Sequence, residues 1–254
     1  MFAEERQQKI FELLEKNSSI KVKELAEMFD VSESTIRRDL QDMEEKQLLK
    51  RTHGGAVGMK KMIFEPTFKE KEDKSQKEKS IIAKTAASLI EDNDTIILDS
   101  GTTTLGIARC LEAKDLTVIT NSIDVASELS ERDDIELVIT GGSLRKKTRA
   151  MVGHIAESTI CNFRVDKAFI GANGISVKEG ITTPNFIEAQ TKRAMMEAAD
   201  KVYIVADASK FNQVCFSVIS SIREVTAVIT SGDLDEEMIK EFEDAGGKII
   251  IMND

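Results

Sequence analysis

The stretch that most restricts the fold is Thr95-Ile-Ile-Leu-Asp-Ser-Gly-Thr-Thr-Thr104. Its aliphatic residues predict a buried strand, its Gly and hydroxyl residues predict a turn, and a helix is expected directly afterwards. A strand that turns into a helix is the first half of a βαβ unit. Amides at the start of such a helix attract an anion. The Walker and dinucleotide glycine spacings are missing, so the stretch indicates a phosphate-binding turn or an ordinary structural turn.

From residue 80 onward, short runs rich in Val and Ile alternate with stretches of helix length. This alternation is typical of βαβ units and predicts a largely parallel sheet in a Rossmann-like α/β domain. The expected strands are 95–99, 116–120, 136–140, 167–171, 201–206, 226–230 and 248–252. The expected helices include 104–112, 124–130, 185–199 and 234–244.

Several of the expected strands end in polar turns. Asn173 lies in a glycine-containing turn after one strand, and Asp207 and Lys210 follow the next strand. In an open α/β sheet, ligands bind beyond the carboxyl ends of the strands. Together these residues predict a site for one anionic, hydroxyl-rich ligand, although each turn by itself uses ordinary turn residues.

The first 57 residues predict a separate helical module. Ser32 is a suitable N-cap for a helix whose apolar side is Ile36, Leu40 and Met43. The opposite face of that helix carries Ser34, Arg37, Arg38 and Gln41. Arginine can pair bidentately with guanine in the major groove, so this face is typical of a DNA recognition helix. The alternatives are a solvated face of an ordinary helix and a helical module that binds another protein.

A basic hairpin follows this helix. Lys50, Arg51 and His53 precede the expected turn at Gly54-Gly55, with no acid among them. With two preceding helices, such a hairpin completes a winged helix-turn-helix, whose wing contacts the DNA backbone or the minor groove. The expected DNA-contacting residues are Ser32, Ser34, Thr35, Arg37, Arg38, Gln41, Lys50, Arg51 and His53.

A lysine-rich segment joins the two parts of the chain. Residues 58–79 contain seven lysines mixed with five acids, and we expect this segment to become helical before Ile81. The predicted organisation is therefore a winged helix-turn-helix domain at 1–57, a linker at 58–79 and a ligand-binding α/β domain at 80–254.

Three segments of the chain resemble the DeoR family of bacterial transcriptional regulators. They are Val22-Lys-Glu-Leu-Ala26, Val31-Ser-Glu-Ser-Thr-Ile-Arg-Arg-Asp-Leu40 and Leu48-Leu-Lys-Arg-Thr-His-Gly-Gly-Ala56. The resemblance extends over nearly the whole chain. It implies a sugar-phosphate sensor domain similar to the ribose-phosphate isomerase and coenzyme A transferase fold.

The same resemblance implies a repressor of a sugar or polyol operon. Such a protein binds double-stranded operator DNA and is released by a phosphorylated sugar or polyol effector. The effector residues that the resemblance implies are Lys71, Lys79, Asp99, Ser100, Gly101, Thr102, Thr103, Asp207 and Lys210. Asn173, Glu188 and Lys192 are weaker candidates for effector binding, and a polar helix face explains Glu188 and Lys192 equally well.

The enzyme alternative is a sugar-phosphate isomerase or transferase with an appended helical domain. Such an isomerase would carry paired acids in an Asp-Gly-Ala-Asp-Glu type of loop. The corresponding Gly171-Ala-Asn-Gly-Ile175 has no carboxylate to move a proton. No Cys, His and acid cluster has metal-ligand spacing. We therefore expect no catalytic residue, no metal and no cofactor.

Composition restricts the partners further. The net charge of −10 opposes non-specific DNA binding, so DNA affinity has to depend on how Arg37 and its neighbours are placed. Three scattered cysteines suit a reducing cytoplasm. The sequence shows no secretory signal and no apolar run of roughly 20 residues, so neither export nor a membrane location is expected. Two-fold operator recognition favours a homodimer or homotetramer.

Overall fold

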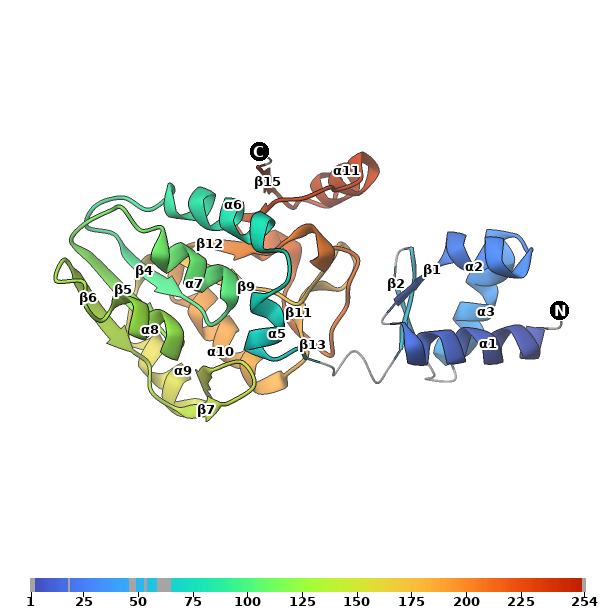
Figure 1. Ribbon diagram of the computed structural model, residues 1–254, viewed down its shortest axis with the longest axis horizontal. Helices are drawn as coiled ribbons and strands as arrows, with labels where there is room; N and C mark the ends of the chain where they lie inside the picture. Colours follow the sequence, from blue (N-terminus) through green and yellow to red (C-terminus); the bar gives the residue numbers. More distant parts are fainter. Residues whose placement is uncertain (1–2, 18, 46–48, 53, 59–64, 253–254) are drawn as a thin grey trace.

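The computed structural model describes residues 3–17, 19–45, 49–52, 54–58 and 65–252. The first part of the chain forms a small domain in which helices pack against an antiparallel three-stranded sheet (Figure 1). Its elements are α1 (Ala3–Lys16), β1 (Ser19–Lys21), α2 (Val22–Phe29), α3 (Glu33–Glu45), β2 (Leu49–Thr52) and β3 (Gly55–Gly58). The strands pair in the order β1-β3-β2, which is the architecture of a winged helix-turn-helix.

The turn between α2 and α3 follows from local side-chain and backbone preferences. Asp30 ends α2 in a left-handed conformation with φ of 52°, which Asp tolerates better than most residues. The Ser32 hydroxyl accepts the Thr35 amide at 3.2 Å, so the predicted N-cap is confirmed. The predicted core side of α3 is also confirmed, since Ile36, Leu40 and Met43 are at most 1% exposed.

The wing hairpin forms as expected, with two differences. Its turn comes one residue earlier than predicted, because Gly55 already belongs to β3 and pairs with Lys21 of β1. A Cβ at Gly55 would lie 1.9 Å from the Ile20 carbonyl oxygen, so only glycine allows this close strand contact. The strand β1 was not predicted, because three residues are too few to show an alternating pattern.

The second part of the chain is built on a seven-stranded sheet in which every neighbouring pair is parallel. Its order is β15-β14-β12-β9-β4-β5-β6. The strands are β4 (Thr95–Leu98), β5 (Leu116–Thr120), β6 (Ile135–Ile139), β9 (Val165–Gly171), β12 (Ala199–Val205), β14 (Ala227–Thr230) and β15 (Ile249–Ile251). Each boundary lies within two residues of the predicted one, and the α/β fold class is confirmed.

Helices cover both faces of this sheet. Ile96 and Leu98 of β4 pack with side chains of α6 (Gln76–Ala87), α7 (Thr102–Arg109) and α8 (Ile123–Leu129). Ile97 points to the opposite face, where α9 (His154–Cys161), α10 (Phe186–Glu197) and α11 (Glu236–Asp244) contribute to a second core. Both faces of the strands are therefore apolar, as in other buried parallel sheets.

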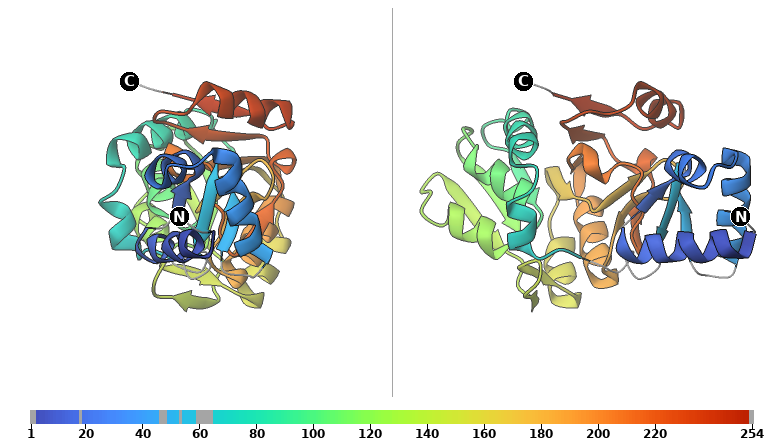
Figure 2. Two further views of the ribbon diagram at one scale, coloured as in Figure 1. Left: turned by 90° about the vertical axis from the view of Figure 1, so that its right-hand side faces the viewer. Right: turned by 45° about the vertical axis from the view of Figure 1, so that its right-hand side comes forward.

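Smaller elements complete the domain at the edges of the sheet. They are α5 (Phe68–Glu72), the hairpin β7 (Ser143–Arg145) and β8 (Ala150–Val152), the antiparallel strands β10 (Gly174–Ser176), β11 (Gly180–Thr183) and β13 (Ser217–Ser220), and the one-turn helices η1 (Ala208–Lys210) and η2 (Ile222–Glu224). In Figures 1 and 2, α11 and β15 lie together at one edge of the molecule. Among the described residues, no helix has the length and apolar character needed to cross a membrane.

The order of the central strands creates a switch point. The chain proceeds from β4 to β5 and β6 in one direction, and β9 then pairs with the other side of β4. The loops that follow β4 and β9 therefore leave the sheet side by side and in opposite directions. A ligand site in an open α/β sheet is expected at this position.

Candidate functional site

The outward face of α3 carries the side chains that the sequence pattern placed there. Ser34, Arg37, Arg38 and Gln41 are exposed. The Arg37 guanidinium lies 3.3 Å from the Glu33 carboxylate, and both side chains are about half exposed. A pair so accessible to water contributes little stability, so Arg37 can exchange this partner for a phosphate or a base edge.

The same helix also has an inward polar residue. Asp39 is 3% exposed and accepts two hydrogen bonds from the Arg6 guanidinium, at 2.5 and 3.0 Å. This pair fastens α3 to α1, 33 positions earlier in the chain. The hydrogen bond to Asp39 raises the pKa of Arg6, so the guanidinium stays charged. The Arg-Arg-Asp run therefore presents Arg37 and Arg38 to solvent and Asp39 to the core.

Both basic residues of β2 contact acids within the chain, Lys50 through its side chain and Arg51 through its backbone. The Lys50 ammonium lies 3.2 Å from the carboxylate of Glu179, which lies between β10 and β11. The Arg51 amide donates to Glu44 at 2.8 Å, and the side chain of Arg51 is half-buried. His53 lies outside the described residues. A role for these wing residues in DNA contact stays a prediction.

A cavity of about 430 Å³ opens at the switch point of the sheet. Its walls come from the loops after β4, β9 and β12, from α10 and from the linker. The predicted effector residues that line it are Lys71, Lys79, Ser100, Gly101, Thr102, Thr103, Asn173, Asp207 and Lys210. The weaker candidates Glu188 and Lys192 line it too.

The start of α7 offers backbone amide donors to this cavity. Gly101 is the N-cap, and the amides of Thr102 and the next residues are in the first turn, where helical geometry leaves them without acceptors within the helix. Thr103 and Thr104 both line the cavity, and Thr104 donates its hydroxyl hydrogen to the Gly101 carbonyl at 3.0 Å. The helix dipole adds a positive potential, which suits a phosphate.

Lysines surround the same space. Burial lowers the pKa of Lys71 and of Lys79, while Glu65 and Asp207, respectively, act in the opposite direction. Lys79 donates a hydrogen bond to the Lys71 carbonyl, which ties the two linker lysines together. Lys210 lies 3.7 Å from Asp207. Cations that have lost hydration in this way favour an anionic ligand.

Asp99 does not occupy the predicted position. It is completely buried behind the cavity wall, where it accepts a hydrogen bond from the Gly171 amide at 3.0 Å and pairs with Lys192. Lys192 also donates to the Gly171 carbonyl at 3.0 Å. Asp99 therefore joins β4, β9 and α10 at the switch point and does not line the cavity, and its contact with an effector stays a prediction.

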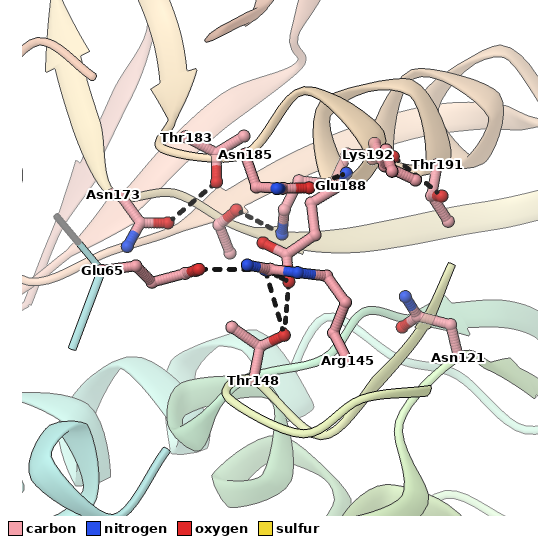
Figure 3. Close-up of polar contacts among 12 residues, drawn as sticks. Glu65, Asn121, Arg145, Thr148, Asn173, Thr183, Asn185, Glu188, Thr191 and Lys192 are labelled. Carbon is pink, nitrogen blue, oxygen red and sulfur yellow. Dashed lines mark hydrogen bonds and ion pairs between the residues drawn. The ribbon is translucent and has the colours of Figure 1, made fainter. Parts of the chain in front are cut away.

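A buried ionic cluster next to the cavity was not predicted as a site. Figure 3 shows Arg145 of β7 between Glu65 and Glu188. Its guanidinium lies 2.9 Å from Glu65 and 2.6 Å from Glu188. Thr148 donates a hydrogen bond to the same Glu188 carboxylate. The only local signal was the position of Arg145 just after a strand end, because its partners are 80 and 43 residues away.

Comparison with known proteins identifies both parts of the chain. A model described as the DeoR-like helix-turn-helix domain matches residues 6–62, and one described as the DeoR C terminal sensor domain matches residues 74–232. The chain belongs to the DeoR family.

DeoR-family relatives match nearly the whole chain. The chain is 40% identical to the uncharacterized HTH-type transcriptional regulator YulB of Bacillus subtilis, over 98% of this chain and 96% of that protein. It is 38% identical to the HTH-type transcriptional regulator GlpR of Haloferax volcanii, over 98% of both. It is 36% identical to the HTH-type transcriptional repressor GlcR of Bacillus subtilis, over 91% of this chain and 89% of that protein. The chain is therefore a DNA-binding transcriptional regulator and not an enzyme.

A solved D-ribose-5-phosphate isomerase is a distant structural neighbour of this DeoR-family chain. It matches 54% of each chain at 19% identity with a TM-score of 0.41, which is too low to bear on activity. Two carboxylates do line the cavity, those of Asp207 and Glu188. Burial raises the pKa of Glu188, but Lys192, Thr148 and Arg145 lower it more, so the net shift is downward. A group held ionised in this way is a poor general base near neutral pH.

Proposed function

We propose that this DeoR-family regulator represses a sugar or polyol catabolic operon and releases double-stranded operator DNA when a phosphorylated sugar or polyol enters the cavity. The observation that carries the proposal is the start of α7 facing a cavity lined by Lys71, Lys79 and Lys210. Amides and desolvated ammonium groups suit a phosphate. Asn173 and Glu188 offer the polar groups that bind sugar hydroxyls.

The DNA half of the proposal is tested on the exposed face of α3. Replacing Arg37 and Arg38 together with alanine should abolish retention of an operator fragment in a gel shift, because both residues face solvent on the helix that enters the groove. The operator fragment is one that the wild-type chain selects from random DNA. The matched control replaces the exposed Arg164 and Lys178 of the sensor domain, which changes the net charge equally. Retention of DNA by the α3 variant would instead favour a helical module that binds another protein.

The effector half is tested in the cavity. A thermal-shift screen of phosphorylated sugars and polyols identifies a ligand, and the same ligand is then added to the DNA complex. Lys210→Ala and Thr102→Ala should keep operator binding but need a higher ligand concentration for release, because each removes a group at the cavity wall. If both variants release DNA at the wild-type concentration, the effector binds elsewhere. Turnover of the ligand that survives mutation of Arg37 would overturn the assignment as a repressor.

We also propose that the regulator acts as a homodimer or homotetramer. Operators read by helix-turn-helix proteins contain two related half-sites, so two recognition helices have to act together. Light scattering of the chain with and without operator DNA tests this expectation. A chain that stays monomeric on DNA would contradict it.

A further inference from the structure

Charged side chains of alternating sign form a row at and behind one wall of the cavity. The row runs through Asp99, Lys192, Glu188, Arg145, Glu65 and Lys71. Three of these groups are acidic and three are basic, so their charges balance without a ligand. Lys192, Glu188 and Lys71 line the cavity, and Glu65 belongs to the linker. The row therefore connects the switch point of the sheet to the chain that comes from the winged helix.

The contact nearest the linker is an ion pair without a hydrogen bond. Glu65 is 2% exposed, and its Oε2 accepts a hydrogen bond from Arg145 at 2.9 Å. Its Oε1 is buried but accepts no hydrogen bond from any described residue, and the Lys71 ammonium lies 3.6 Å from it. The Lys71 side chain is 27% exposed and lines the cavity. Lys71 is thus held loosely by Glu65 and is within reach of a ligand.

We propose that Glu65 is a built-in competitor of the effector phosphate for Lys71, and that losing this competition loosens residues 65–67, which lead into α5. A phosphate carries more charge than a carboxylate and can approach Lys71 to hydrogen-bond distance. Glu65 would then keep only Arg145, whose charge Glu188 already balances at 2.6 Å. This inference rests on the proposed function, because it requires an anion in the cavity.

The loss of the Glu65–Lys71 contact would destabilise the start of helix α5. Five residues are too few to form a stable helix alone, so α5 depends on contacts at its ends. Thr67 and Glu70 form a capping box, and Phe68 is 8% exposed with the Arg149 guanidinium 5.9 Å from its ring centre. Glu65 holds the chain just before the cap. If Glu65 loses its ion pair with Lys71, the hydrogen bonds of the capping box should open more often while Phe68 stays packed.

The test compares the full wild-type chain with Glu65→Gln, using inorganic phosphate as the probe. Glu72→Gln is the matched control, because Glu72 is exposed on α5 next to Lys71. Its replacement changes the net charge by the same amount as Glu65→Gln. Isothermal titration should show phosphate binding to Glu65→Gln about fivefold more tightly than to wild type, since the Glu65 carboxylate no longer competes for Lys71. The control should stay within about twofold of wild type.

Amide hydrogen exchange of residues 67–71 provides the second measurement. In wild type, saturating phosphate should speed this exchange, and in Glu65→Gln the exchange should be fast with or without phosphate. Unchanged exchange in phosphate-saturated wild type, or equal phosphate affinities for the Glu65 and Glu72 variants, overturns the role of Glu65 and leaves the cavity assignment standing. Failure of phosphate to bind wild type at all overturns this inference and the proposed anion site together.

Discussion

Replacing Asp39 with alanine should unfold the winged helix-turn-helix, because Asp39 is buried and paired with Arg6. The Asp39 and Arg6 side chains are 5% and 6% exposed and share two hydrogen bonds. Alanine would leave the Arg6 guanidinium without its carboxylate in a poorly hydrated position. Removing one partner of a buried ion pair costs about 3 kcal/mol, the low end of the usual range, because Arg6 on α1 can turn toward water.

This loss is large for so small a domain. A core of this size supplies roughly 3–5 kcal/mol in total, so the variant domain should be close to unfolded at growth temperature. Its melting temperature should fall by roughly 15 °C. DNA binding would be lost for a structural reason, unlike the loss in the Arg37 and Arg38 variant, whose fold should persist.

The chain offers a way to observe each domain separately. Tyr203, the single tyrosine, is stacked on Phe169 inside the sensor domain, and there is no tryptophan. Urea unfolding followed by tyrosine fluorescence therefore reports the sensor domain, whereas far-UV circular dichroism reports both domains. Asp39→Ala should shift the dichroism transition of the winged helix-turn-helix to lower urea. The fluorescence transition of the sensor domain should stay unchanged.

Two controls test the reasoning about Asp39. Asp42→Ala removes an exposed carboxylate from the same helix and should change stability by no more than about 0.5 kcal/mol. The double variant Arg6→Met with Asp39→Leu should regain most of the loss, because apolar residues of similar size can replace a buried pair. If Asp39→Ala unfolds within about 0.5 kcal/mol of wild type, the pair does not stabilise the domain as we argue.

Three further predictions concern other parts of the chain. Burial raises the pKa of Cys215 to about 11, so this thiol should resist iodoacetamide near neutral pH while the exposed Cys161 is alkylated, as mass spectrometry can show. The matching stability contribution should be present below the ordinary thiol pKa and be lost as pH rises toward 11. Gly55→Ala should cost about 2 kcal/mol in the dichroism transition, because its Cβ would meet the first strand. Asp99→Ala should lower the fluorescence-detected stability by about 3 kcal/mol by leaving Lys192 buried and unpaired.

The regular elements could be predicted because their signals are local. A strand or helix orients its own side chains with a fixed period, so the buried face of α3 and the strands of the main sheet were placed to within two residues. Short elements escaped prediction. The strands β1, β7, β8 and β10 have three residues each, and so few residues cannot show a period.

The candidate cavity was predictable only in part. Turn residues at strand ends pointed to its wall, since parallel strands bring their carboxyl ends to one edge of the sheet. Glu65, Arg145 and Thr148 were not predicted, because a buried ion pair has no signal in the sequence around either partner. Asp99 shows the opposite case, because its place in a polar turn suggests an exposed side chain but that side chain is buried.

Sequence alone determined the two-part organisation, the α/β alternation, the outward face of α3 and the family. These properties depend on residues a few positions apart, because the regular geometry of a helix or strand fixes which of their side chains share a face. Tertiary structure alone decided that Asp99 lies behind the cavity, that Asp39 fastens α3 to α1, and that Glu65 meets Arg145. Those contacts depend on the order in which strands join the sheet, because only that order brings charges from distant segments within a few ångströms of one another.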